Sequence, residues 1–344
     1  MFSLKNIVRP TIQQLKPYSS ARDEFKGTAE VYLDANENPF GKYNRYPDPL
    51  QLSLKTKLSE IKKASINQIF IGNGSDEVID IAFRIFCEPG KDKALTFSPT
   101  YGMYDVSAAI NNVELIKQHL LSDFQINLNQ LQPYLEMDDV KLLFICSPNN
   151  PTGNCINKED IEYILNNFNG IVIIDEAYID FSTKVSFISE IENYPNLIVS
   201  QTFSKAWGLA GVRVGVAYAN KEIINLYNKV KPPYNVSTLN EEAVLKKLEN
   251  LTQFEIEKNI ILKEREKLIT ELQKNSFVTK IFPTETNFIL IEVNNANQLY
   301  KELVAKKIVT RNRNSLVNNC LRITVGSPEE NQKLINTLIT LQEI

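Results

Sequence analysis

The sequence predicts an α/β protein with a mostly parallel central sheet flanked by helices, followed by a smaller α+β C-terminal domain. Between about residues 65 and 220, short apolar runs alternate with stretches whose apolar residues recur at helical spacing. The apolar runs are nearly continuous, which is typical of strands covered on both faces of a parallel sheet. After Lys231, the prolines Pro232 and Pro233 end this rhythm, and a strongly charged stretch follows.

The first predicted strand covers residues 68–71, and a Gly/Ser/Asp turn joins it to a helix with an apolar face from Val78 to Phe86. Further strands are predicted over residues 94–97, 113–120, 141–146, 170–174, 197–200 and 212–217, with helices beginning near Tyr101 and Lys158. The alternation of strands with helices predicts that consecutive strands are parallel and joined by crossover helices.

The pattern changes in the last third of the chain. We expect a long charged helix over residues 239–273, a strand over 287–293, a helix around 298–306, a strand over 320–325 and a last helix from Pro328. The sequence therefore predicts an N-terminal arm of residues 1–28, a large domain of residues 29–231 and a small domain of residues 232–344.

The composition favours small-molecule chemistry. Of the 344 residues, 43% are hydrophobic and 23% are charged, and the formal net charge is −3. Because the chain has no basic excess, neither a nucleic acid nor an anionic membrane is expected as a partner. The apolar runs are far shorter than the ~20 residues that cross a bilayer, and the N-terminus lacks the apolar core of a secretory signal. We therefore expect a cytoplasmic protein.

Rare residue types exclude other kinds of site. The four cysteines, Cys87, Cys146, Cys155 and Cys320, contain no C-x-x-C pair, which favours reduced structural thiols over disulfides or a zinc site. The single histidine, His119, lies in a predicted strand. A Ser-His-Asp triad or a multi-histidine metal site is therefore not expected.

The segment TFSKAWGLAGVR, residues 202–213, follows a predicted strand, and strand ends are where open α/β sheets place ligand groups. Lys205 lies here among small, hydroxylated and apolar neighbours. Desolvation in such surroundings lowers the pKa of an amine from about 10.4 and makes it a nucleophile. Lys205 is thus either a nucleophilic amine or a surface lysine in a loop.

A second strand end carries a carboxylate. Asp175 ends the predicted strand over residues 170–174, and Tyr178 follows three residues later. An ionised Asp at a buried strand end needs a cationic partner. This need favours a ligand-binding role for Asp175.

Two further turns follow predicted strands. Asn150 lies in SPNNPTG, residues 147–153, which is either a simple Pro/Gly loop or a rigid turn that presents an amide side chain. Ser75 and Asp76 follow Gly72 and Gly74 at the start of a helix, where free backbone N–H groups can hold a phosphate. This turn lacks the third glycine of the dinucleotide fingerprint.

Together the four turns supply an amine, a carboxylate, a phenol, an amide and an anion site, which is the set that pyridoxal 5′-phosphate requires. The sequence resembles the fold type I pyridoxal-phosphate-dependent aminotransferases, and within them it is similar to the histidinol-phosphate aminotransferase family. The similarity extends over nearly the whole chain, through PYSSAR (residues 17–22), LDANENP (33–39), RYP (45–47) and LRITVG (321–326).

The resemblance implies a role for each cofactor-binding residue. Lys205 would hold the cofactor as a Schiff base and move the proton between the substrate α-carbon and C4′. Asp175 would keep the ring nitrogen protonated. Tyr178 and Asn150 would donate to the 3′ oxygen, Tyr101 would stack on the ring, and Ser75, Asp76, Thr202, Ser204 and Arg213 would bind the phosphate. Asp76 would act first through its backbone, because a carboxylate beside a phosphate is repulsive unless it faces its own helix N-terminus as a cap.

The resemblance also implies a substrate site and a dimer. Arg322 and Arg311 would bind the substrate phosphate or a dicarboxylate, because a planar guanidinium suits either anion. Arg313 is an alternative to Arg311, since the Asn-rich segment that follows leaves the register open. Tyr18 and Asn36 would complete the substrate pocket, and Tyr46 would reach into the partner subunit's site of a homodimer.

The predicted reaction transfers the amino group of glutamate to imidazole acetol phosphate to give L-histidinol phosphate, a step of histidine biosynthesis, and runs in both directions. The alternatives of the same fold are an aminotransferase for aromatic or other amino acids and a threonine-phosphate decarboxylase. A dinucleotide-dependent oxidoreductase is a weaker alternative, suggested by Gly72 and Gly74 after a strand. A non-catalytic regulator would need a basic DNA-binding module, which the segment before the core lacks.

Overall fold

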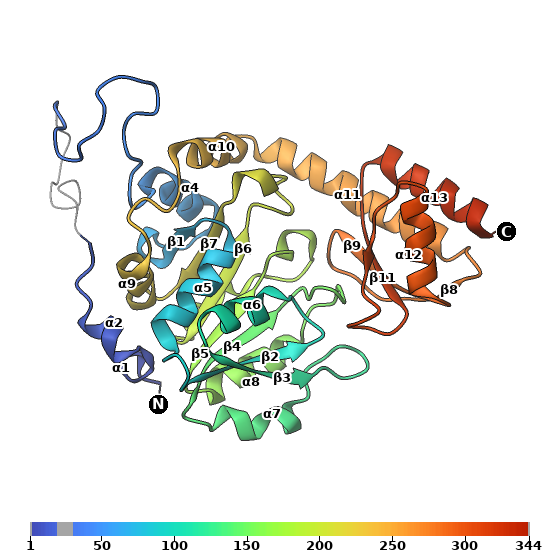
Figure 1. The fold of residues 1–344 in the computed structure, drawn as a ribbon, viewed down its shortest axis with the longest axis horizontal. Helices are drawn as coiled ribbons and strands as arrows, with labels where there is room; N and C mark the ends of the chain where they lie inside the picture. Colours follow the sequence, from blue (N-terminus) through green and yellow to red (C-terminus); the bar gives the residue numbers. More distant parts are fainter. Residues whose placement is uncertain (1, 19–29, 343–344) are drawn as a thin grey trace.

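The computed structural model describes residues 2–18 and 30–342, and the described chain forms two sheets (Figure 1). The larger sheet has seven strands in the order β1-β7-β6-β5-β4-β2-β3. They are β1 (Ile69–Gly72), β2 (Lys93–Ser98), β3 (Glu114–His119), β4 (Val140–Cys146), β5 (Ile171–Asp175), β6 (Leu197–Thr202) and β7 (Gly215–Ala219). Neighbours from β3 to β6 pair in parallel, whereas β7 runs antiparallel to both β6 and β1. The predicted α/β fold with a mostly parallel sheet is confirmed.

Both faces of the large sheet are buried. On β5, Val172 and Ile174 pack into one hydrophobic core, and Ile171 and Ile173 pack into another on the opposite face. Helices cover the two faces: α4 (Leu52–Lys62), α5 (Ser75–Phe86), α6 (Met103–Ile110), α7 (Leu128–Leu135), α8 (Lys158–Asn167) and α9 (Lys221–Val230). Because both faces of the sheet are buried, the sequences of its strands consist of nearly continuous apolar residues.

The smaller sheet is antiparallel and has the order β10-β11-β9-β8. Its strands are β8 (Val278–Ile281), β9 (Phe288–Val293), β10 (Arg311–Asn312) and β11 (Cys320–Thr324). Three helices accompany it: α11 (Leu251–Leu272), α12 (Ala296–Ala305) and α13 (Pro328–Gln342). Leu268 of α11 and Leu334 of α13 share a core with Ile291 and Leu321 of the sheet.

The helix α11 connects the two halves of the molecule. Near its N-terminal end, Phe254 packs into a core of the large sheet, and near its C-terminal end Leu268 and Leu272 pack into the core of the small sheet. Figure 1 shows α11 extending from α10 (Thr238–Leu248), above the large sheet, to the side of the small sheet.

Several elements differ from the sequence expectation. The single helix expected over residues 239–273 is two helices, α10 and α11, because the side chain of Asn250 accepts a hydrogen bond from the backbone of Gln253 and caps a new helix. The strand expected from residue 212 begins at Gly215, since Arg213 has a left-handed backbone with φ of 57°. The sequence did not indicate α1 (Leu4–Ile7), α2 (Pro10–Gln14), α4, α7, β8 or β10.

Four short 3-10 helices complete the described elements, over Ile66–Gln68, Ile179–Phe181, Phe187–Glu190 and Ala210–Val212. Within residues 2–18 and 30–342, no helix combines the length and apolar character needed to cross a membrane. Part of the predicted N-terminal arm, residues 19–28, lies outside the described residues.

Candidate active site

A pocket opens where the carboxyl ends of β4, β5 and β6 approach the N-terminus of α5. The pocket is lined by Ser75, Asp76, Tyr101, Cys146, Asn150, Asp175, Ala177, Tyr178, Thr202, Ser204, Lys205 and Arg213. All but Cys146 and Ala177 are predicted cofactor-binding residues. The structure therefore brings together side chains that come from five separate segments of the chain.

Lys205 lies in the turn that follows β6. Its carbonyl accepts a hydrogen bond from Gly208 N at 3.1 Å, which closes the turn. Its Nζ lies 5.6 Å from the centroid of the Tyr178 ring. Partial burial lowers the pKa of Lys205, and the positive charge of Arg322 lowers it further. Both effects increase the fraction of neutral, nucleophilic amine.

Asp175 ends β5 and is 3% exposed. Its Oδ2 accepts a hydrogen bond from the hydroxyl of Tyr104 at 2.9 Å, and its Oδ1 accepts one from the backbone of Ala177 at 3.1 Å. Burial raises the pKa of Asp175 to about 6, although the hydrogen bond from Tyr104 opposes this shift. Asp175 is thus a buried acid that gains from a cationic partner in the pocket.

A chain of polar contacts begins in the pocket wall and links Tyr178, Asn150 and Arg322. The Nδ2 of Asn150 lies 3.5 Å from the hydroxyl of Tyr178, and Nη1 of Arg322 donates to Oδ1 of Asn150. Burial raises the pKa of Tyr178, while Arg322 lowers it. The phenol therefore stays protonated and can donate a hydrogen bond into the pocket.

The N-terminus of α5 and Arg213 form an anion cradle. A Cβ at Gly74 would lie 2.7 Å from Nη2 of Arg213, and one at Gly215 would lie 2.2 Å from the backbone nitrogen of Ser75. Glycine at both positions lets the backbone approach closely, and no side chain caps α5. The first N–H groups of a helix have no partner within the helix and attract an anion.

Hydroxyl groups line the other side of this cradle. The hydroxyl of Thr202 accepts a hydrogen bond from the backbone of Ser204 at 3.1 Å, and Nη1 of Arg213 lies 3.5 Å from the hydroxyl of Ser204. Two hydroxyls, one guanidinium and a helix N-terminus together make a donor set that fits a phosphate group.

Asp76 does not cap its helix. Its Oδ1 accepts a hydrogen bond from the hydroxyl of Tyr101 at 3.1 Å, and its Oδ2 lies 3.5 Å from Nη2 of Arg213. Gly74 occupies the capping position and Asp76 lies within the first turn, so the Asp76 side chain is not a cap, and the expected backbone role of Asp76 stays a prediction. The carboxylate instead orients the guanidinium and the phenol that flank the cradle.

Three arginines lie on one face of the β10–β11 pair. Arg311 and Arg322 are directly opposite each other in the antiparallel register, and Arg313 N donates to the carbonyl of Cys320 at 2.9 Å. Burial, together with the positive charges of Arg322 and Arg311, lowers the pKa of Arg313 to about 10. Among the described residues, Nε of Arg313 and Nε of Arg322 lack hydrogen-bond partners. Such a cluster of positive charge is stabilised by a bound anion.

Comparison with known proteins decides the family. The model of the aminotransferase class I and II family matches residues 19–338. The chain belongs to this family. A histidinol-phosphate aminotransferase from Christiangramia forsetii is 52% identical over 346 residues, and one from Flavobacterium psychrophilum is 49% identical; each alignment covers 99% of both chains. The histidinol-phosphate aminotransferase structure from Clostridium acetobutylicum matches with a TM-score of 0.80 at 27% identity, over 88% of this chain and 91% of that chain.

These matches confirm the predicted family and enzyme class. They do not test the roles of single residues, and three predicted residues of the aminotransferase lie apart from the Lys205 pocket. Tyr18 is 72% exposed. Asn36 and Tyr46 line a different depression, and the Tyr46 ring stacks on Tyr234 with centroids 4.3 Å apart.

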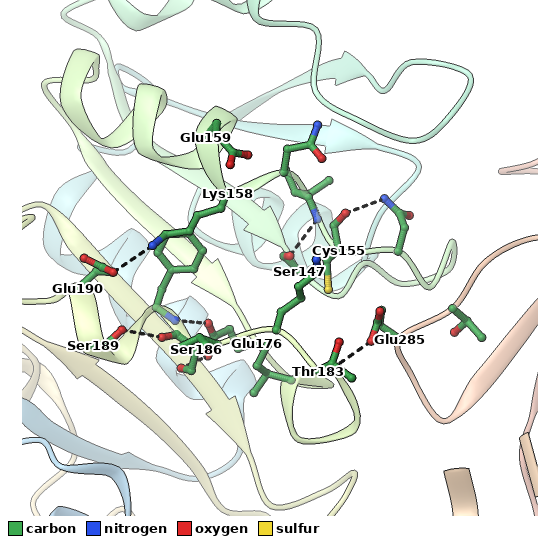
Figure 2. A pocket seen from close by; sticks show the side chains of 18 of the residues that line it. Ser147, Cys155, Lys158, Glu159, Glu176, Thr183, Ser186, Ser189, Glu190 and Glu285 are labelled. Carbon is green, nitrogen blue, oxygen red and sulfur yellow. Dashed lines mark hydrogen bonds and ion pairs between the residues drawn. The ribbon is translucent and has the colours of Figure 1, made fainter. Parts of the chain in front are cut away.

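A larger cavity of the aminotransferase, of about 640 Å³, lies beside the segment 283–285 (Figure 2). Several of its charged side chains have partners: Lys158 pairs with Glu190 at 3.2 Å, and Glu176 accepts from the hydroxyl of Ser186 and from the backbone of Phe187 at 2.7 Å. The cavity also contains the free thiol of Cys155, and burial raises the pKa of this thiol, which disfavours the nucleophilic thiolate. Among the described residues, no group of three or more His, Cys, Asp or Glu side chains is placed to hold a metal ion.

Two residues beside the site, Tyr104 and Cys146, were not among the predicted site residues, although Cys146 was expected to be a structural thiol. Tyr104 is fully buried and donates to Asp175, and Cys146 lines the pocket with a thiol whose pKa is raised by burial. Tyr104 follows Tyr101 by three residues, a spacing that would place both on one face of a helix and that could have indicated a shared site, although α6 begins only at Met103. A raised pKa keeps the Cys146 thiol protonated, so it adds no second nucleophile.

Proposed function

We propose that this chain interconverts L-histidinol phosphate and 2-oxoglutarate with imidazole acetol phosphate and L-glutamate, using pyridoxal 5′-phosphate held by Lys205. The observation that carries the proposal is the convergence of Lys205, Asp175 and Tyr178 on one pocket that also contains an anion cradle. Relatives that are about half identical over nearly the full length carry this activity in their names. When bound, the cofactor supplies a ring that withdraws electrons from the substrate α-carbon.

The protein residues have separate tasks in this proposal. The Nζ of Lys205, once the substrate amine had replaced it on the cofactor, would move the proton between the substrate α-carbon and C4′, which its lowered pKa favours. The carboxylate of Asp175 keeps the ring nitrogen cationic. The phenol of Tyr178 and the amide of Asn150 donate to the 3′ oxygen, and the ring of Tyr101 packs on the cofactor face.

The phosphate of the cofactor fits the cradle formed by the N-terminus of α5 and Arg213. Ser75 and Asp76 supply backbone N–H groups, and Thr202 and Ser204 supply hydroxyls. The substrate's own phosphate requires a second anion site. Arg311 and Arg322 are suited to it, because they are opposite each other and Arg322 reaches Asn150 in the pocket wall.

We further propose a homodimer with shared sites. Apolar side chains of the segment before α4 are largely exposed: Leu33 is 91% exposed and Phe40 is 82% exposed. A second copy that covers this segment would bury them and would bring Tyr46 toward the partner's cofactor phosphate. Asn36, which lies in this segment, and Tyr18, which precedes it in the sequence, would then reach the substrate pocket.

Two more proposals concern organisation and location. Val236, Val244 and Phe254 pack into the large-sheet core, whereas Leu268 packs with the small sheet. The two domains therefore meet within α11, closer to residue 260 than to residue 231. We place the protein in the cytoplasm, because its four cysteines are unpaired and its proposed reaction is biosynthetic.

The central test is loading of the cofactor. We expect the purified protein to bind pyridoxal 5′-phosphate with a visible absorption band, and borohydride reduction to leave the adduct on Lys205, located by peptide mass spectrometry. Lys205→Ala should lack the adduct. Lys158→Ala, which removes an exposed lysine paired with Glu190, serves as the matched control and should load normally.

The second test is the half-reaction. Histidinol phosphate should convert the bound cofactor to its amine form and yield imidazole acetol phosphate. Ready conversion by phenylalanine but not by histidinol phosphate would instead identify an aromatic aminotransferase. Release of carbon dioxide from phosphothreonine would identify a decarboxylase.

A further inference from the structure

Tyr104 is a buried residue that contacts the acid of the proposed site without lining the pocket. It lies in the first turn of α6 and is 0% exposed. Its hydroxyl donates to Oδ2 of Asp175 at 2.9 Å, across 71 positions of sequence. Packing alone does not explain the hydroxyl of Tyr104, because phenylalanine would fill the same buried space. The hydroxyl is explained by its hydrogen bond to the buried carboxylate of Asp175.

The Tyr104 ring is held from two sides. It stacks on Phe144 of β4 with centroids 4.9 Å apart, and it meets Tyr101 edge to face at 5.7 Å. Tyr101 is the residue proposed to pack on the cofactor ring. Tyr104 therefore contacts both Tyr101, which would pack on the face of the cofactor ring, and Asp175, which would face its nitrogen.

The hydroxyl of Tyr104 is one of two hydrogen-bond donors to the carboxylate of Asp175. Asp175 accepts two hydrogen bonds, from Tyr104 at Oδ2 and from the Ala177 backbone at Oδ1. Without the hydroxyl, only the Ala177 bond remains, and the carboxylate is freer to turn. A hydrogen bond donated to a carboxylate also favours its ionised form, whereas burial disfavours that form.

We propose that Tyr104 is a positioning residue that holds Asp175 ionised and aims its carboxylate at the pyridine nitrogen of the cofactor. The inference rests on the proposed function, because it requires pyridoxal 5′-phosphate in the Lys205 pocket. Tyr104 itself does not touch the cofactor and acts through Asp175.

The test compares Tyr104→Phe with the wild type in the binding of two cofactors. We expect the variant to bind pyridoxal 5′-phosphate about tenfold more weakly, since a hydrogen bond to a charged group is lost. Binding of the 1-deaza analogue, which lacks the ring nitrogen, should change less than about twofold. Equal weakening of both cofactors would indicate a packing role and would overturn the proposal, as would unchanged binding of both.

A second arm uses a double-mutant cycle with Asp175→Asn. If Tyr104 acts through Asp175, adding Tyr104→Phe to Asp175→Asn should not weaken pyridoxal phosphate binding further. Additive losses would contradict the proposal. The turnover number should fall in Tyr104→Phe while the KM for histidinol phosphate stays within about twofold, since the substrate subsite is untouched.

The matched control is Tyr227→Phe. Tyr227 of α9 is also fully buried, and its hydroxyl donates to the carbonyl of Val78 at 3.0 Å, so the variant loses a buried hydrogen bond without changing Asp175. It should lose stability to urea and keep normal cofactor affinity. A wild type that binds neither cofactor would refute the proposed function, whereas normal wild-type binding with an unaffected Tyr104→Phe refutes this inference alone.

Discussion

Arg311 and Arg322 lie directly opposite each other on the neighbouring antiparallel strands β10 and β11. Like charges at directly opposed positions destabilise a sheet, so their retention needs a benefit outside folding. In the proposed function, an anion bound between them would supply this benefit. The histidinol phosphate of the proposed reaction carries such an anion, and glutamate carries two carboxylates.

The first prediction concerns these arginines. Arg311→Gln removes the repulsion, and we expect unfolding in urea to require a few tenths of a kcal/mol more free energy. The same change should raise the KM for histidinol phosphate about tenfold or more, because a charged hydrogen-bond donor is lost. Steady-state kinetics and urea unfolding measure the two effects.

Lys301→Gln, at an exposed position of α12 in the same half of the molecule, is the control and should leave the KM unchanged. Arg313→Gln tests the alternative register. If it raises the KM while Arg311→Gln does not, Arg313 takes the role that we assign to Arg311.

The second prediction follows from the burial of Asp175, which raises its pKa from 3.8 to about 6. A carboxyl whose folded pKa exceeds its unfolded pKa binds more protons when folded, so stability falls as pH rises from about 4 to 6. In the cofactor-free protein, Asp175→Asn should remove this loss. The free energy of unfolding of the variant relative to the wild type should therefore increase by roughly 1 to 3 kcal/mol between pH 4 and pH 6.

Urea unfolding at several pH values, on protein stripped of cofactor, gives this difference directly. Transamination by Asp175→Asn should fall by at least about a hundredfold, because the ring nitrogen loses its counter-charge. A stability difference that is flat across this pH range would show that Asp175 titrates normally in the folded protein.

Much of this site was accessible from sequence because it depends on local pattern. Apolar runs predicted the parallel strands, and carboxyl ends of parallel strands meet at one edge of a sheet. Asp175 follows such a run directly, and Lys205 lies in the turn after another, so their meeting in one pocket could be anticipated from the fold class together with the resemblance.

Other features depend on contacts between distant segments. The role inferred for Tyr104 requires its hydroxyl, which comes from α6, to reach Asp175 at the end of β5, and no local sequence pattern indicates that contact. The break between α10 and α11 was missed because the apolar spacing continues across it while Asn250 caps a new helix. The two-residue strand β10 is too short to carry a periodic signal.

The third prediction concerns Trp207, the only tryptophan of the chain. It lies two residues after Lys205, its Nε1 donates to Oδ2 of Asp180 at 3.0 Å, and its ring stacks on Phe254 with centroids 3.8 Å apart. Trp207→Phe keeps an aromatic ring but loses the donor. We expect it to lower the free energy of unfolding by about 1 to 2 kcal/mol, because the acceptor is a carboxylate.

Asp180→Asn provides the comparison, since its amide oxygen still accepts from Trp207 while the ion pair with Lys62 is lost. It should destabilise the protein less than Trp207→Phe. In the wild type, binding of the cofactor beside Lys205 should quench the single tryptophan emission. An unquenched emission in fully loaded protein would place the cofactor away from the Lys205 turn.

The fourth prediction tests the shared sites of the proposed dimer. Lys205→Ala and Tyr46→Ala should each be poorly active alone, the first because it lacks the amine and the second because it lacks a phosphate contact from the partner. In a mixed dimer, one site receives Lys205 from one chain and Tyr46 from the other, so it is intact. Co-expression of the two variants with different affinity tags should therefore restore up to about half of the wild-type activity per mixed dimer.

In the matched control, Lys205→Ala is co-expressed with a chain that carries both Tyr46→Ala and Lys205→Ala. Neither chain then supplies Lys205, so no dimer contains an intact site. Activity should then stay at background, even though mixed dimers still form and are purified by both tags. If the first mixture stays inactive while sedimentation shows a dimer, Tyr46 serves its own subunit. Its stack on Tyr234, with ring planes 12° apart, would then be a feature of the fold of one chain.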